Sequence, residues 1–167
     1  MFKFFKKQAG FSILEVVVAF SVITMGMIGV SSLITQNIQV QYVNKDNLIA
    51  FQLAQEGLEL ARNKRDKNWL EGKDWLSDIT PGKYIMDYTG YIKSVSGIEE
   101  AVLQQRDDVG KEGYYWYGEN DLNTIFSRLI TISQASPESF NVSCLVQWKD
   151  RGQTYQYSAE TVLYNWR

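Results

Sequence analysis

One acidic side chain stands alone in a long apolar segment near the start of the chain. Between residues 11 and 34 the only ionisable side chain is that of Glu15, whereas residues 1–10, MFKFFKKQAG, contain three lysines and no acid. A charge at the centre of a membrane helix costs about 2.5–3.5 kcal/mol on insertion scales, and the cost falls near the positive N-terminal end of the helix. Glu15 is therefore a candidate functional residue, and its chemistry is that of a fixed negative charge able to pair with a cation.

The composition excludes most other kinds of site. The chain has 167 residues, 17 Lys and Arg against 19 Asp and Glu, one Cys and no His. Without His and with a single Cys, it lacks the standard zinc sites, a Cys–His or Ser–His–Asp nucleophile set and an internal disulfide. No P-loop or glycine-rich phosphate fingerprint occurs, and a net charge of -2 gives no indication of nucleic-acid binding. We expect no enzyme activity, no cofactor and no metal.

The apolar segment is long enough to cross a bilayer. About 20 mostly apolar residues suffice for a membrane helix, and the lysines of residues 1–10 would hold its N-terminal end in the cytoplasm. A cleaved secretory signal fits poorly, because the apolar run is too long, lacks an A-x-A-like site at its end and contains a carboxylate. A plain signal anchor would explain the length but would give Glu15 no purpose. The sequence therefore predicts a single-pass protein with an exported C-terminal portion.

The residues around Glu15 resemble a known signal. The segment GFSILEVVVAF, residues 10–20, is similar to the class III signal of type IV pilins and type II secretion pseudopilins. The resemblance implies that a prepilin peptidase cuts between Gly10 and Phe11, that the new amine of Phe11 is methylated, and that the apolar helix is retained. Glu15 would then be the fifth residue of the mature chain.

The spacing of these residues has a physical logic. Glu15 lies four residues from the new amine, one helical turn away, and can compensate a positive terminus on its own subunit or on a neighbouring one. At 4 Å and an effective dielectric constant near 20, such a pair is worth about 4 kcal/mol before desolvation. A buried pair of this kind mainly sets register, because removing one partner leaves an uncompensated charge. In the family this contact draws the incoming subunit into the filament.

A single long helix is expected to follow. No proline precedes Pro81, and after Ile34 the sequence becomes amphipathic. The predicted buried stripe is Ile38, Tyr42, Ile49, Leu53, Leu60 and Ala61. A helix from Phe11 to about Arg65 would be about 80 Å long. The charged run RNKRDKNW, residues 62–69, is expected to close the helix as a solvated end whose cations complement the helix dipole.

Two glycines interrupt the apolar half of this helix. Gly26 and Gly29 either loosen the helix or allow close helix packing, and the sequence does not decide between these roles. In many pilins a proline loosens the helix at this depth, but here Ser32 stands in its place. This difference favours a minor pilin or a pseudopilin over a major pilin.

The C-terminal portion is predicted to form a small antiparallel sheet. Apolar and polar residues alternate with a period of two along residues 126–132, 142–148 and 155–163, and the turn DRGQ at residues 150–153 separates the last two. Weaker strands are expected at 84–88 and 114–117. One apolar face of the sheet should cover the amphipathic half of the helix, and this arrangement is similar to a pilin head.

Four features of the head have two interpretations each. Cys144 alternates with apolar residues, which favours a buried, inert thiol over a reactive one. The oxygen-rich segment 119–123 is interpreted as a polar turn rather than a calcium site, since it lacks EF-hand spacing. Asn141 begins a glycosylation sequon, but a single sequon within a predicted strand is weak evidence for glycosylation. The aromatic run 114–117 fits core packing or an adhesive patch.

The sequence thus predicts an α+β protein of four segments: a leader (1–10), a membrane or filament-core helix (11–34), its amphipathic continuation (35–69) and a β-rich head (70–167). The resemblance implies a filament subunit whose partners are the prepilin peptidase, other pilin subunits, the membrane and the pilus assembly platform. It would reside in the bacterial cytoplasmic membrane before assembly and in a surface or periplasmic filament afterwards. The alternative is a monomeric, signal-anchored extracytoplasmic binding module.

Overall fold

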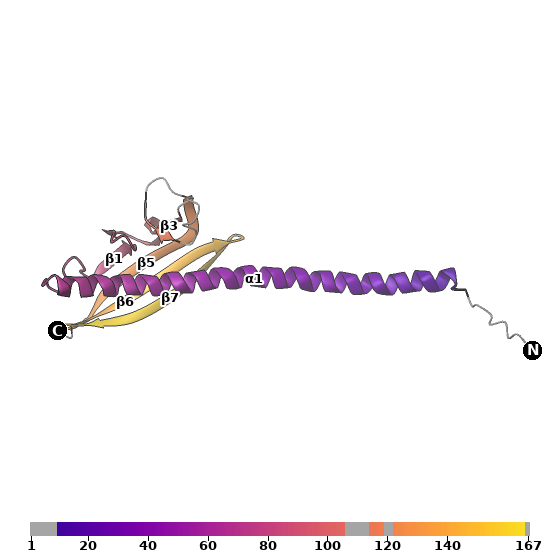
Figure 1. The fold of residues 1–167 in the computed structure, drawn as a ribbon, viewed down its shortest axis with the longest axis horizontal. Helices are drawn as coiled ribbons and strands as arrows, with labels where there is room; N and C mark the ends of the chain where they lie inside the picture. The colour runs from indigo at the N-terminus through magenta and orange to yellow at the C-terminus, as the bar shows by residue number, and fades with distance from the viewer. Residues whose placement is uncertain (1–9, 106–113, 119–121, 166–167) are drawn as a thin grey trace, which may run out of the picture. The chain divides into compact units, whose positions relative to one another are not determined.

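The computed structural model describes residues 10–105, 114–118 and 122–165. Its first element is α1 (Ile13–Leu70), a helix of 58 residues that runs without interruption past Gly26 and Gly29 (Figure 1). The chain divides into two compact units between Lys45 and Asp46, so α1 contributes to both. The single long helix predicted from the sequence is therefore present.

The part of α1 in the first unit has no buried side chains. Every residue from 10 to 42 is exposed. Ile38 and Tyr42, which the amphipathic pattern predicted to be buried, are 47% and 59% exposed. That prediction is wrong for these two residues, because the sheet begins to cover the helix only near residue 50.

In the second unit α1 packs one stripe against the sheet. Its buried residues are Ala50, Leu53, Ala54, Gly57, Leu58, Ala61, Arg65 and Asn68, with Ile49 and Leu60 partly buried. Half of these eight buried residues are Ala or Gly, which lets the helix backbone approach the sheet closely.

The helix ends at Leu70, one residue beyond the segment 35–69 predicted for its amphipathic continuation. The charged run 62–69 is helical, and it is not simply a solvated end, because Arg65 and Asn68 are buried. The side-chain Nδ2 of Asn68 donates hydrogen bonds to the backbone carbonyl oxygens of Trp75 (3.2 Å) and Ser77 (2.6 Å). These bonds hold the connector that follows the helix. Gly72, with a φ of 69°, allows the chain to turn away from the helix.

The rest of the second unit is one antiparallel sheet of seven strands. The strands are β1 (Gly82–Met86), β2 (Ile92–Ser94), β3 (Val102–Gln105), β4 (Tyr115–Trp116), β5 (Leu122–Ser136), β6 (Ser139–Asp150) and β7 (Gln153–Tyr164), with a short 3₁₀ helix η1 (Ile98–Glu100) before β3. β5 is the centre of the sheet: one edge pairs with β6, and the other pairs first with β3 and then with β1. β2 extends β1 and β4 extends β3.

The C-terminal hairpin follows the predicted register. β6 and β7 pair over twelve consecutive positions, from Asp150 and Gln153 to Ser139 and Tyr164. Arg151 and Gly152 both have positive φ, 48° and 82°, as a two-residue hairpin turn of type I′ requires. The pattern did not predict β2, β3 or η1, because segments of three or four residues are too short to show a period.

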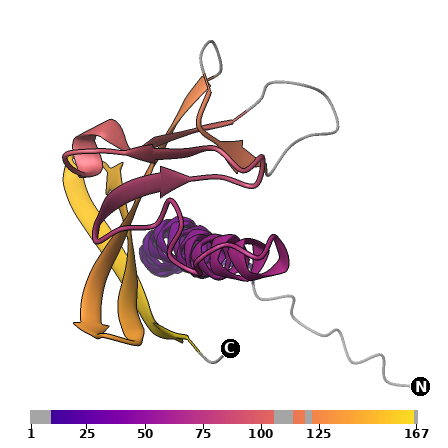
Figure 2. The same cartoon turned by 90° about the vertical axis from the view of Figure 1, so that its left-hand side faces the viewer.

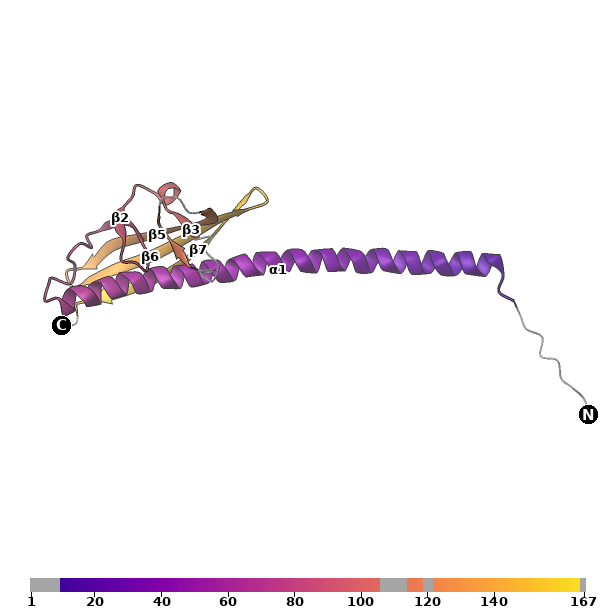
Figure 3. The same cartoon turned by 45° about the horizontal axis from the view of Figure 1, so that its top comes forward.

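The sheet has an apolar layer on each face. Its inner face curves around the second half of α1 (Figure 2), and the core there includes Phe126, Ile130, Cys144 and Trp148. A smaller core on the outer face contains Ile85, Val95, Ala101 and Leu129, with Ile98 of η1 packed against it. Figure 3 shows β3, β5 and β6 on one side of α1. The fold is α+β and pilin-like, as predicted.

Candidate processing and assembly site

The predicted cleavage junction lies just outside the start of α1. Gly10, Phe11 and Ser12 precede the helix, and the first helical hydrogen bond runs from the Val16 amide to the Ser12 carbonyl oxygen, 3.2 Å away. Gly10 is exposed and has no atom within 4 Å of the position that a Cβ would occupy. Phe11 is 82% exposed. The backbone at this junction is therefore accessible to an enzyme.

Glu15 lies in the first turn of α1, where its negative charge complements the helix dipole. It borders a shallow recess of about 360 Å³ that is otherwise apolar and is lined by Phe11, Glu15, Val16, Ala19, Phe20 and Ile23. Within the described part of the chain, no hydrogen bond or ion pair engages the Glu15 carboxylate. The side chain is thus available to a cation supplied from outside the helix.

The segment that carries Glu15 is suited to a membrane. Among the described residues, α1 is the one helix that is long and apolar enough to span a bilayer, with a window of mean hydropathy 2.3 that is wholly exposed. Exposed apolar surface on this scale needs lipid or protein to cover it, since its transfer from water is favourable by about 25 cal/mol per Å².

Comparison with known families bears on the same residues. The family model of the prokaryotic N-terminal methylation motif matches residues 5–31, which include the Gly10–Phe11 junction and Glu15. The chain carries the class III signal of type IV pilins and pseudopilins. No curated protein and no solved structure matches this chain. The motif nevertheless supports a type IV pilin-like or pseudopilin-like protein, and it points to a structural subunit rather than an enzyme.

The pilin-like head is held to α1 by a close approach at Gly57. A Cβ at this position would overlap Sγ of Cys144 and would lie 3.3 Å from Cδ of Arg128. Only glycine therefore lets the helix rest on the centre of the sheet at this distance. The sequence gave no sign of this role, because a lone glycine inside a helical pattern has no distinguishing context.

Arg128 is the charged side chain at this contact, and it is fully buried. Its guanidinium donates to the carbonyl oxygens of Leu53 in α1 (3.4 Å) and Met86 in β1 (2.7 Å) and pairs with the Glu56 carboxylate at 2.9 Å. It also lies 6.0 Å from the centre of the Tyr117 ring. A single residue therefore ties the helix to two strands. Its position among alternating apolar residues was the available signal for burial.

Cys144 behaves as the alternation predicted. It is fully buried beneath Gly57, and burial raises the pKa of its thiol to about 12. At neutral pH the thiol is protonated and inert. Burial similarly raises the pKa of Tyr117 to about 12, and its hydroxyl donates to the Arg128 carbonyl oxygen at 2.7 Å.

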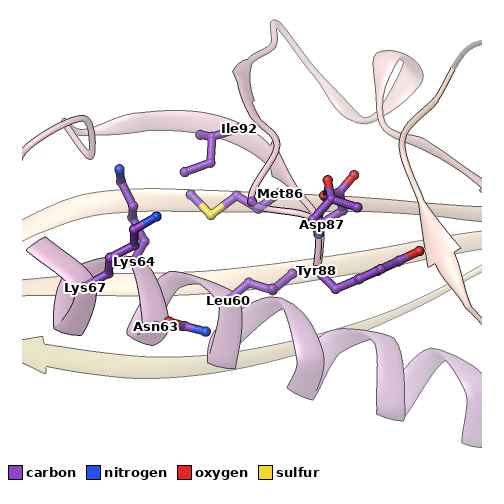
Figure 4. A pocket seen from close by; sticks show the side chains of 10 residues that line it. Leu60, Asn63, Lys64, Lys67, Met86, Asp87, Tyr88 and Ile92 are labelled. Carbon is purple, nitrogen blue, oxygen red and sulfur yellow. Dashed lines mark hydrogen bonds between the residues drawn. The ribbon is translucent and has the colours of Figure 1, made fainter.

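A pocket of about 280 Å³ beside α1 does not resemble a cofactor site (Figure 4). Leu60, Met86 and Ile92 supply apolar lining, and Lys64 and Lys67 stand at its helical wall. Both lysines are already paired, Lys64 with Asp78 at 3.0 Å and Lys67 with Glu71 at 3.9 Å. The described residues contain no group of three or more His, Cys, Asp or Glu side chains able to hold a metal ion.

The remaining candidate residues of the head stay predictions. Residues 119–121 of the oxygen-rich segment lie outside the described part of the chain, and residues 122–123 begin β5. Asn141 is exposed on β6, paired with Ser133 and Val162. In the aromatic run 114–117, Tyr114 is 57% exposed and the other three residues are half-buried.

Proposed function

We propose that this chain is a subunit of a type IV pilus-like or secretion pseudopilus filament. The observation that carries the proposal is the class III signal joined to a continuous, fully exposed apolar helix. Prepilin peptidase would cut after Gly10, the amine of Phe11 would be methylated, and the helix would stay with the mature chain. Subunits would then pack through residues 11–34 with the head outside that core.

Glu15 is proposed to guide assembly. Its carboxylate stands at the edge of an apolar recess and has no partner among the described residues. The methylated amine of an adjacent subunit is a cation of matching charge, and their attraction strengthens as water is excluded. An unpaired Glu15 would oppose burial of the helix, so the same group would favour correctly registered neighbours over misplaced ones.

The protein is proposed to be a minor pilin or pseudopilin. Ser32 replaces the proline that loosens the helix of many pilins, and α1 runs straight through this depth as one helix. Before assembly the chain would sit in the cytoplasmic membrane with its N-terminus inside. The assembly platform and other pilins would be its partners there. Afterwards it would belong to a surface or periplasmic filament.

Two substitutions test the proposal separately. In Gly10→Val the added branched side chain should block access of the peptidase, so the protein extracted from membranes should keep the mass of the uncleaved chain. In Glu15→Val cleavage and insertion should persist, whereas filament content after shearing and blotting should fall. Gly97→Val is the control, because Gly97 lies in the head with open space around its Cβ position and an extended φ of -169°.

If Gly10→Val is trimmed normally, the peptidase does not cut after Gly10 and the assigned cleavage site is wrong. Equal filament content in Glu15→Val and the parent would contradict the role in assembly assigned to Glu15. A parent chain that is never trimmed and never leaves the membrane fraction would favour the monomeric, signal-anchored binding module.

A further inference from the structure

A groove of about 580 Å³ lies on the outer face of the sheet, opposite the second half of α1. Leu103 of β3 is buried in the core beneath α1, whereas its neighbours Val102 and Gln104 line the groove. Ile85 belongs to the outer core. The groove is lined by Ile85, Tyr91, Lys93, Glu99, Glu100, Val102, Gln104, Tyr117, Gly118 and Asn123.

An aromatic ring is presented at this groove by a fixed turn. Tyr91 is 42% exposed, and its backbone amide donates to Oδ1 of Asp87 at 3.2 Å. Asp87 is 2% exposed; Oδ1 also accepts from the Thr89 amide at 2.9 Å, and Oδ2 accepts from the Tyr117 amide at 3.2 Å. The buried carboxylate therefore ties the turn that carries Tyr91 to the end of β4, so the backbone position of Tyr91 is fixed in advance of any ligand.

Two amide side chains are also held in place. Nε2 of Gln104 donates to Oδ1 of Asn123 at 3.0 Å, and Oε1 of Gln104 accepts from the Gly118 amide at 3.2 Å. The amide group of Asn123 keeps its two N–H donors for other partners. Glu99 and Glu100 at η1 are exposed, and within the described residues no hydrogen bond or ion pair engages their carboxylates.

We propose that this groove binds a neutral saccharide. The apolar face of a pyranose ring packs on an exposed aromatic ring, while the hydroxyl groups donate to carboxylates and exchange hydrogen bonds with amides. Tyr91 would supply the ring, Glu99 and Glu100 the acceptors, and Asn123 the donors. Two glutamates against Lys93 disfavour an anionic ligand, because like charges on ligand and rim repel.

This inference goes beyond the proposed function and does not depend on it. Assembly through the N-terminal half of α1 would use none of the groove residues. Binding can be measured on the unassembled, full-length protein, so failure of the saccharide site would leave the filament proposal untouched, and loss of filament assembly would leave the site untouched.

The test uses the full chain in micelles of a detergent without a sugar headgroup. Cellotetraose, chitotetraose and maltotetraose are titrated by calorimetry, with polygalacturonate as the anionic comparison. We expect at least one neutral tetrasaccharide to bind with a Kd of about 1 mM or tighter, a free energy of about -4 kcal/mol. Polygalacturonate should bind more weakly than that tetrasaccharide.

Tyr91→Ala should weaken this binding by about tenfold, whereas Tyr91→Phe should keep it, since the ring provides the packing surface. The alanine variant retains the backbone amide that Asp87 accepts from, so the turn should persist. Tyr164→Ala is the matched control, because Tyr164 is a 57% exposed tyrosine on β7, outside the groove. No binding of any neutral tetrasaccharide, equal losses in Tyr91→Ala and Tyr164→Ala, or tightest binding of polygalacturonate would overturn the proposal.

Discussion

Two charged side chains stand in apolar surroundings, and only one of them finds partners within the described chain. Arg128 is buried in the head, where its two terminal nitrogens contact Glu56 and two backbone carbonyls, while its Nε makes no hydrogen bond to a described residue. Glu15 lies in the exposed apolar helix beside a recess and has no such partner. A charge satisfied internally stabilises a fold, whereas a charge left without a partner in an apolar surface indicates an interaction with another molecule.

At the residue scale, substitution of Gly57 gives the clearest prediction about the stability of the fold. Gly57→Ala should lower the free energy of unfolding, because overpacking against Cys144 costs about 1–3 kcal/mol while the gain in helix propensity is at most about 1 kcal/mol. Chemical denaturation of the detergent-purified protein would measure this. Adding Cys144→Ala should recover part of the loss by removing Sγ, and Gly97→Ala, with open space around it, should have little effect. A neutral Gly57→Ala would contradict the close approach.

The buried thiol predicts a specific dependence on pH. The pKa of Cys144 is about 12 in the folded protein against an ordinary value of 9.0, so between these values the thiol ionises in the unfolded chain alone. Its contribution to stability is therefore fully present below pH 9 and is lost as the pH rises toward 12. The full shift corresponds to about 4 kcal/mol.

Cys144→Ala should consequently lose less stability than the parent between pH 8 and pH 11. The comparison of urea midpoints at the two pH values cancels the cost of the cavity, which is the same at both. Parallel decreases in parent and variant would mean that the thiol is not protected by burial.

At the element scale, Arg128 is expected to hold α1 on the sheet mainly through carbonyl groups. Arg128→Ala should cost about 2–5 kcal/mol, because it empties a buried volume and leaves the carbonyl oxygens of Leu53 and Met86 without this donor. Glu56→Gln should cost less than Arg128→Ala, because the amide oxygen of Gln can still accept from the guanidinium although the charge of the buried Arg128 loses its counter-ion.

Equilibrium unfolding in urea distinguishes these two variants. Lys149→Ala, at an exposed position of β6, is the control for a lost cation on the sheet and should resemble the parent. If Glu56→Gln were as damaging as Arg128→Ala, the ion pair rather than the carbonyl contacts would hold the junction.

The elements with a repeating pattern were predictable from the sequence, and the unpatterned ones were not. β6 and β7 show a strict period of two around a DRGQ turn, and α1 follows from an apolar run without proline. The charged run 62–69 was expected to be a solvated end of α1, but Arg65 is buried and packs over Trp69 at 4.7 Å. The aliphatic stem of an arginine can be buried in this way while its charge is retained.

The candidate sites likewise differ in how far the sequence could predict them. The residues proposed for processing and assembly, Gly10, Phe11 and Glu15, lie close together in sequence, so their motif could be recognised directly. The outer groove is assembled from β1, β2, η1, β3 and the segments around β4 and β5, and no spacing rule links Tyr91 to Glu99 or Asn123. Such a site appears only once the strands are paired. Gly57 was missed for the same reason, since its role depends on what the sheet places opposite it.

At the scale of the whole molecule, the two units present different surfaces. The first offers apolar side chains to lipid or protein along residues 11–34, with one carboxylate near its start. The second has an apolar core on each face of its sheet. This division suits a subunit that polymerises through its N-terminal helix, because the assembly surface can be buried without disturbing the folded head.

The most direct test of the account is the intact mass of the polypeptide recovered from sheared surface filaments. The account predicts a chain that has lost residues 1–10, begins at Phe11 and carries one additional methyl group. A chain that still begins at Met1 and is found only in the membrane fraction would contradict it.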